Sequence, residues 1–139
     1  MFKVMKKIFG GGQRPEPVRR PRRESPAGED RESHGPWVGV DLDGTLAIWD
    51  NQSSLRRIGK PVPGMLEFVK RMLKTGIQVK IFTARAGDPR QVAMIKKWLV
   101  ANGLPVLDVT NVKDYNMQTL YDDRCVQVER NTGRIISEI

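Results

Sequence analysis

From Trp37 onward, short apolar runs alternate along the chain with segments in which apolar residues recur every three or four positions. Runs of four to seven residues, rich in Val and Ile and flanked by polar residues, are typical of buried strands. These runs are residues 37–43 (WVGVDLD), 77–83 (IQVKIFT), 105–110 (PVLDVT), 118–121 (QTLY) and 125–128 (CVQV). The last is the least regular, so we expect four strands and a candidate fifth, with a turn or short helix around Asp114–Met117.

Two of the intervening segments have helical spacing and recognisable ends. Pro63 and Gly64 begin the first, and Gly76 follows its last turn as the usual left-handed stop. Asp88 is the predicted N-cap of the second, which Gly103 closes. The apolar stripes are Met65, Leu66, Val69, Met72 and Leu73 in the first helix, and Val92, Ile95 and Leu99 in the second.

Strands that alternate with amphipathic helices predict an α/β fold. The expected architecture is a three-layer, Rossmann-like parallel sheet with helices on both faces and right-handed crossovers. A chain of 139 residues with 39% hydrophobic content has room for one such domain. We therefore expect one active site, within residues 37–139.

The first 36 residues have a different composition. Residues 10–36 are rich in Gly, Pro and charge, so they are predicted to be a disordered linker. Residues 1–9 place apolar side chains near one helical face and lysines near the other. This nonapeptide is interpreted as a frayed terminus, with contact to a membrane surface or docking onto a partner as the alternatives.

Most of the net charge of +8 lies in this N-terminal tail. Of 24 Lys and Arg and 16 Asp and Glu, residues 1–23 hold eight basic residues and one acidic residue. The remainder holds 16 basic and 15 acidic residues and is nearly neutral. Any recruitment of nucleic acid is therefore expected from the tail and not from the folded domain.

The residue inventory excludes several classes of protein. A single Cys and a single His make an internal disulfide impossible and a zinc site of nitrogen and sulfur ligands implausible. No apolar run reaches the roughly 18 residues that a membrane-spanning helix needs. We expect a soluble, cytoplasmic protein in which carboxylates hold any metal.

Polar residues suited to phosphate chemistry follow each of the first four predicted strands. They are Asp41, Asp43 and Thr45 after the first strand, Thr83 after the second, Lys113 after the third, and Asp122 and Asp123 after the fourth. Ligands of a parallel sheet bind at the carboxyl ends of its strands. The order of these residues predicts one site that all four groups share.

These residues also carry a resemblance to a known family. DLDGTL at 41–46, IFTAR at 81–85, Lys113 and YDDR at 121–124 resemble, in order, the four motifs of the haloacid dehalogenase (HAD) superfamily. The first strand and YDDRCVQV are also similar to the phosphatase domain of phage polynucleotide kinase and to small phage-encoded HAD-like hydrolases. The resemblance covers residues 37 to about 130 and implies a magnesium-dependent phosphomonoester hydrolase.

The resemblance assigns a role to each group. It implies Asp41 as the nucleophile that forms an aspartyl-phosphate, and Asp43 as the acid and base. Magnesium ligands would be Asp41, the Asp43 carbonyl and Asp122, with Asp123 as ligand or support. Thr83 and Lys113 would hold phosphate oxygens, aided by backbone N–H groups near Gly44 and Ala84. Thr45 and Arg85 complete the expected substrate-binding set, and nucleotides or nucleic-acid ends are candidate substrates.

Alternatives to this interpretation stay open at this point. DxDG also occurs in calcium loops, but the twelfth position from Asp41 is Gln52 and not Glu. Arg85 and Arg124 are as compatible with surface ion pairs as with substrate contact. Cys125 is expected to be a small core residue, and Trp49, Trp98 and Tyr121 to be packing or rim residues. A phosphotransferase, or a binding module tethered by its basic tail, would use the same fold.

The lengths of the loops exclude the cap domain that many HAD enzymes carry. Residues 46–62 suffice for a short flap that includes Trp49, and residues 84–112 are used by one helix and one strand. An open site of this kind suits a phosphate on a large molecule, or a small substrate covered by a neighbouring subunit.

Overall fold

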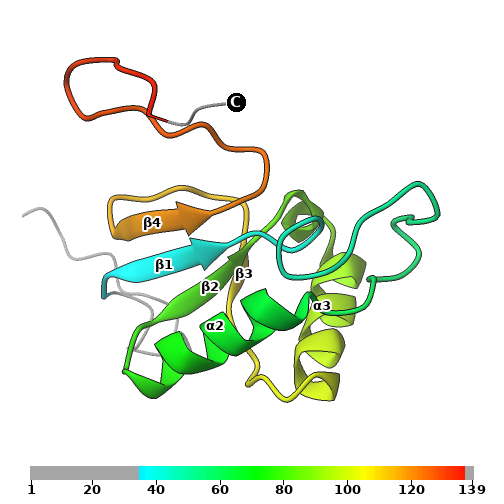
Figure 1. Ribbon diagram of the computed structural model, residues 1–139. Coiled ribbons are helices and arrows are strands. Elements are labelled where there is room, and N and C mark those ends of the chain that lie inside the picture. Colours follow the sequence, from blue (N-terminus) through cyan, green and yellow to red (C-terminus); the bar gives the residue numbers. More distant parts are fainter. Residues whose placement is uncertain (1–34, 137–139) are drawn as a thin grey trace, which may run out of the picture. The chain divides into compact units, whose positions relative to one another are not determined.

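A parallel four-stranded sheet forms the centre of residues 35–136, the part of the chain that this computed structural model describes (Figure 1). Its strands are β1 (Trp37–Val40), β2 (Val79–Phe82), β3 (Val109–Thr110) and β4 (Met117–Tyr121). They lie in the order β3-β2-β1-β4, and each neighbouring pair is parallel. The predicted parallel α/β sheet is therefore confirmed.

The two long helices begin and end where their capping residues predicted. Helix α2 (Pro63–Lys74) begins at its proline, and Gly76 follows it with φ of 82°. Helix α3 (Pro89–Ala101) begins after Asp88, whose side chain accepts a hydrogen bond from the Arg90 N–H. These caps satisfy backbone groups that the first and last turns would otherwise leave unpaired.

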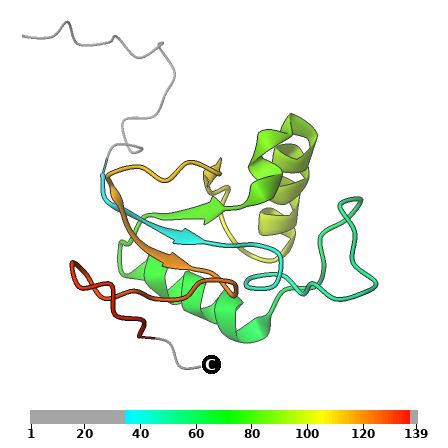
Figure 2. The ribbon, with the colours of Figure 1, turned by 90° about the horizontal axis from the view of Figure 1, so that it is seen from above.

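Both helices pack on the same face of the sheet. Val69 of α2 and Ile95 of α3 belong to one apolar cluster, together with Val40 of β1 and Ile81 of β2. The chain moves from β1 to β2 to β3 in one direction, and right-handed crossovers then place both helices on one side of the sheet, below the strands in Figure 1; Figure 2 shows the sheet from above. The prediction of helices on both faces is wrong for residues 35–136, because the connection from β3 to β4 contains no helix.

The opposite face of the sheet carries a smaller group of side chains. Trp37 is 1% exposed, donates its indole N–H to Asp114 at 2.9 Å, and lies 4.8 Å from the Lys80 ammonium. A Cβ on Gly39 would lie 3.0 Å from Leu120, so only a small residue fits between these strands. Trp37 and its contacts lie at the amino end of β1, away from the predicted site at the carboxyl ends of the strands.

The predicted fifth strand is absent from the described residues. Residues 125–128 leave the sheet and enter a loop that folds back on itself (Figure 1). In this loop Val128 makes an isolated antiparallel bridge with Ile135. Asn131 and Gly133 have positive φ, so the chain reverses there instead of continuing along β4. As a result Cys125 is exposed, and its prediction as a core residue is wrong.

A loop of residues 48–60, here called the flap, projects beyond the end of β1 (Figure 1). Its legs meet in an antiparallel bridge between Ala47 and Pro61, and the Ile48 N–H donates to the Lys60 carbonyl at 2.8 Å. A Cβ on Gly59 would lie 2.2 Å from the Ile48 carbonyl oxygen, so glycine is required for this approach. The short flap predicted after the first strand is present.

The predictions for the N-terminal tail, including linker disorder and contacts with nucleic acid or a membrane surface, fall on residues 1–34 and lie outside the described residues. Within residues 35–136, no helix is long and apolar enough to cross a membrane.

Candidate active site

The carboxyl ends of the strands bring the predicted groups to one edge of the sheet. Asp41 follows β1 directly, and its N–H donates to the carbonyl of Tyr121, the last residue of β4. On the other side, the Thr83 N–H after β2 donates to the carbonyl of Thr110 at the end of β3. These backbone bonds fix the strand ends relative to one another before any side chain contributes.

Three carboxylates gather at this edge and form what we call the acidic cluster. Asp41, Asp122 and Asp123 each offer one oxygen, and these oxygens lie within 4.8 Å of one another. Asp41 is 7% exposed, Asp122 is half-buried and Asp123 is exposed. Carboxylate oxygens are the ligands that hard divalent cations prefer, so the cluster could hold a metal ion.

The charges of the acidic cluster oppose one another. Burial, followed by the negative charge of Asp122 and a hydrogen bond with Asp123, raises the pKa of Asp41 to about 7. Burial alone would raise the pKa of Asp123, but hydrogen bonds from Thr45 and Asp41 lower it overall. Without a cation, Asp41 therefore retains a proton below about pH 7, and a bound cation would replace that proton by supplying positive charge.

A tight turn after Asp41 determines where the neighbouring side chains point. The Leu42 carbonyl accepts backbone hydrogen bonds from Leu46 and Ala47 at 2.9 and 2.8 Å. Gly44 adopts φ of 88°, and a Cβ there would lie 2.5 Å from an oxygen of Asp123. A side chain at Gly44 would strain the backbone and displace part of the acidic cluster.

Thr45 connects this turn to the acidic cluster. Its hydroxyl donates to the Asp123 carboxylate at 2.8 Å and accepts from the Asp123 N–H at 3.0 Å. The Gly44 N–H is likewise engaged, with the Ala47 carbonyl at 2.8 Å. The structure thus shows Thr45 and the Gly44 N–H in internal bonds, and their expected contacts with substrate stay predictions.

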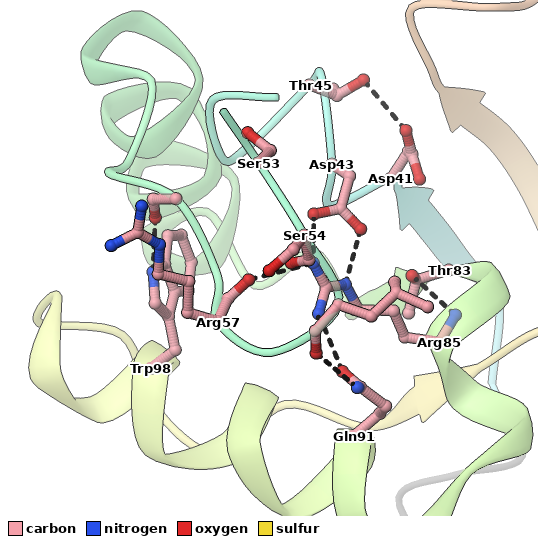
Figure 3. Close-up of polar contacts among 12 residues, drawn as sticks. Asp41, Asp43, Thr45, Ser53, Ser54, Arg57, Thr83, Arg85, Gln91 and Trp98 are labelled. Carbon is pink, nitrogen blue, oxygen red and sulfur yellow. Dashed lines mark hydrogen bonds and ion pairs between the residues drawn. The ribbon is translucent and has the colours of Figure 1, made fainter. Parts of the chain in front are cut away.

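Asp43 points away from the acidic cluster and toward Arg85 (Figure 3). Both of its oxygens accept from the guanidinium, at 2.7 and 2.9 Å, in a two-pronged ion pair. Arg85 is only 5% exposed, so the alternative of a surface ion pair for this residue is wrong. The carboxylate of Asp43 is not a member of the metal-binding group, and a role for its carbonyl stays a prediction.

Arg85 also holds the flap. Its guanidinium donates to the carbonyls of Ser54, Leu55 and Arg57 at 3.2 to 3.4 Å, and to the Gln91 side-chain oxygen at 2.8 Å (Figure 3). We call Arg85 with these partners and Asp43 the flap anchor. It joins the loop after β1 to the loop after β2 and to helix α3.

Two side chains of α3, Gln91 and Trp98, bond directly to the flap. The Gln91 amide nitrogen donates to the Leu55 carbonyl at 2.7 Å, and the Trp98 indole donates to the Gly59 carbonyl at 2.9 Å. Trp98 therefore acts as the packing residue that the sequence predicted. Trp49 lies within the flap, 46% exposed, with the Arg85 guanidinium 5.8 Å from its ring centre.

Thr83, Ala84 and Lys113 occupy different positions around the site. Thr83 is 3% exposed, and its hydroxyl accepts from the Arg85 N–H at the start of a short 3-10 helix, η2 (Ala84–Gly87). Ala84 is exposed at that turn, and Lys113 is exposed in the loop between β3 and β4. Their expected contacts with phosphate stay predictions.

Two cavities flank the acidic cluster. The first, the flap cavity, has a volume of about 560 Å³ and is lined by Asp43, Trp49, Leu55 and Arg124 among others. The second, the β4 cavity, has about 960 Å³ and is lined by Lys113, Asp122 and residues of β4. Asp123 lines both, which places the acidic cluster between them.

Sequence reasoning missed the flap anchor. Arg85 was singled out for its motif, but nothing in the sequence linked it to Asp43 or to flap carbonyls about 30 residues earlier. The sequence does place Arg85 two residues after Thr83, at the end of a predicted strand. This position alone indicates that its side chain lies near the site. Tyr121, in contrast, packs as expected, edge-on to Phe68 at 5.1 Å.

The fold and the site define an α/β protein with a carboxylate cluster at the carboxyl edge of a parallel sheet. No protein family model and no curated protein matches the chain. One solved structure that resembles it is described as "Structure of the conserved protein coded by locus from Bacteroides thetaiotaomicron". It is 20% identical, with a TM-score of 0.52 over 66% of this chain and 78% of that chain. At this identity the likeness supports the fold alone.

Proposed function

We propose that this protein is a magnesium-dependent phosphomonoester hydrolase of the HAD type. The observation that carries the proposal is the contrast between Asp41 and Asp43, which leave the same strand two residues apart. Asp41 lies in the acidic cluster, whereas Asp43 is paired with Arg85. Two carboxylates in such different surroundings are suited to different roles in one reaction.

Asp41 is suited to the role of nucleophile. Its carboxylate attacks phosphorus, the ester bond to the alcohol oxygen breaks, and an aspartyl-phosphate forms. A magnesium ion held by Asp41, Asp122 and Asp123 would offset the repulsion between these carboxylates and a dianionic phosphate. Burial of Asp41 supports the proposal because a nearly dry nucleophile is poorly solvated and well oriented.

Asp43 is suited to proton transfer. Each of its oxygens accepts one N–H from Arg85 and keeps a second lone pair for a proton. In the proposed reaction Asp43 first takes up a proton from solvent on this lone pair and donates it to the departing alcohol oxygen, and it then takes one proton from the water that attacks the aspartyl-phosphate. The second step releases inorganic phosphate and restores the carboxylate of Asp41.

Lys113 and Thr83 complete the proposed site. The positive charge of Lys113, on the wall of the β4 cavity, would stabilise the oxygens of the phosphoryl group during transfer. Thr83 would add a hydroxyl from the end of β2, where its backbone is held by β3. Lys113→Ala should therefore lower turnover of phosphate monoesters.

A screen of phosphate monoesters in the presence of MgCl₂ tests the proposal. Released phosphate is measured for the parent, for Asp41→Asn, and for Asp108→Asn as an exposed control whose side chain makes no hydrogen bond or ion pair within residues 35–136. Turnover that is lost in Asp41→Asn and kept in Asp108→Asn supports the hydrolase. Magnesium binding without turnover of any monoester would favour the alternative of a binding module.

A further inference from the structure

The flap cavity lies on the side of the acidic cluster that Asp43 faces. Asp43 and Asp123 form its inner wall, while Lys113 lines the β4 cavity instead. A proton donor must contact the oxygen that departs, and a phosphate-binding cation must contact the oxygens that remain. If the proposed hydrolase reaction holds, on which this inference rests, the alcohol part of the substrate leaves through the flap cavity.

The outer wall of the flap cavity is apolar and comes from the flap. Trp49 is 46% exposed and Leu55 is 59% exposed, although the flap itself is firmly bonded to Arg85 and Gln91. Large apolar side chains held on a rigid loop, beside a cavity, indicate a surface for a ligand. A volume of about 560 Å³ lies within the range of about 300–1,000 Å³ of small-molecule pockets.

Two polar side chains that line the flap cavity, Gln91 and Arg85, are already used within the protein. Gln91 accepts from Arg85 through its oxygen and donates to the Leu55 carbonyl through its nitrogen. The guanidinium of Arg85 is occupied by Asp43 and the flap carbonyls. A polyhydroxyl alcohol would gain no hydrogen bond from these two side chains, whereas a flat ring that packs on Trp49 and Leu55 needs only contact area.

We propose that the flap cavity is a leaving-group site for phosphate monoesters whose alcohol carries a flat aromatic or heteroaromatic ring, which stacks against Trp49. The exposed remainder of the Trp49 indole supplies the stacking surface, and Leu55 packs against the ring edge. Arg124, exposed at the rim with no side-chain hydrogen bond in the described residues, remains available to a substrate anion.

A matched pair of substrates isolates ring flatness from size. Benzyl phosphate and cyclohexylmethyl phosphate have similar volumes, but only the first is flat. With MgCl₂ present, the parent should hydrolyse benzyl phosphate with the higher kcat/KM. Trp49→Leu should lower that kcat/KM by about tenfold to a hundredfold, which corresponds to the loss of about 1.4–2.7 kcal/mol of stacking, and Trp49→Phe should retain most of it.

Two controls define the effect. Tyr115→Leu removes another exposed aromatic ring, outside the flap cavity, and should leave both substrates unaffected. Ribose 5-phosphate, which has no aromatic ring, should respond little to Trp49→Leu. Equal kcat/KM values for the flat and puckered substrates, or an equal loss of both in Trp49→Leu, would overturn the leaving-group site while leaving the hydrolase intact.

A measurement of benzyl phosphate binding tests the flap cavity independently of hydrolysis. The Kd of benzyl phosphate is measured by calorimetry with the Asp41→Asn protein and MgCl₂, where no turnover is expected, with and without Trp49→Leu. Weaker binding in the double variant supports the cavity even if the parent hydrolyses nothing, which would refute the hydrolase alone. Binding that is unchanged by Trp49→Leu would overturn the cavity assignment.

Discussion

The acidic cluster and the flap anchor arise from the same turn after β1, but they balance their charge differently. In the flap anchor, Arg85 neutralises Asp43 and its remaining donors reach flap carbonyls and Gln91. In the acidic cluster, Asp41 faces two further carboxylates, and its pKa rises to about 7. The flap anchor is complete within the chain, whereas the acidic cluster calls for a cation from solution.

This difference separates stability from chemistry. A buried ion pair with all donors used stabilises the positions of the loops it joins, because breaking it leaves a charge without a partner. A cluster of like charges destabilises the fold until a cation binds, and it can therefore bind one tightly. Variants of the flap anchor should therefore change mainly the free energy of unfolding, whereas variants of the acidic cluster should change mainly turnover and cation binding.

The largest expected effect is the loss of turnover in Asp41→Asn. The amide keeps the shape of the side chain but cannot attack phosphorus, so we expect a loss on the order of 10⁴-fold or more in kcat. The metal-free variant should melt no earlier than the parent at pH 8, since a buried charge has been removed. Residual kcat within tenfold of the parent would exclude Asp41 as the nucleophile.

Arg85→Met tests the flap anchor. It leaves Asp43 and the flap carbonyls without their donor, and we expect the free energy of unfolding in urea to fall by about 3 kcal/mol. Arg134→Met is the matched control, because Arg134 pairs with Glu129 on the surface and should contribute less than about 1 kcal/mol. Similar losses in the two variants would mean that the flap anchor adds no more than a surface pair.

The pH dependence of stability distinguishes the acidic cluster from the flap anchor. Because the folded pKa of Asp41, about 7, lies above its ordinary value of 3.8, the folded state binds the extra proton between these limits. In EDTA, the contribution of Asp41 to the free energy of unfolding should therefore be greatest near pH 4 and fall by about 2–4 kcal/mol as pH rises to 8.

Magnesium should reverse this trend, because cation binding requires Asp41 to be deprotonated. Melting temperature is measured from pH 4 to 8 with EDTA and with MgCl₂, and Asp41→Asn serves as the control with a flatter profile. A parent profile in EDTA that matches Asp41→Asn would show that Asp41 titrates near its ordinary pKa.

The smallest expected effect comes from Gly44→Ala. Positive φ and the short approach to Asp123 should lower stability by about 1–2 kcal/mol and weaken magnesium binding. Gly64→Ala is the matched control, since Gly64 lies in α2 with open space where a Cβ would be added, and this substitution should not lower stability. Magnesium affinity in Gly44→Ala equal to the parent would show that Asp123 contributes nothing to the cation site.

The sequence by itself determined the elements whose signals are local. Apolar period and capping residues located α2 and α3 to within one or two residues, and short apolar runs located β1, β2 and β4. The rule that parallel strands end at one edge was sufficient to bring Asp41, Asp122 and Asp123 together.

Only the tertiary structure decided the features that depend on partners far apart in the chain. The direction of the crossovers put both helices on one face, and a turn at residues 131–133 took the predicted fifth strand away from the sheet and exposed Cys125. The pairing of Asp43 with Arg85 joins residues 42 positions apart. Local patterns specify which backbone conformation a segment adopts, but long-range charge pairing depends on how those segments are brought together in space.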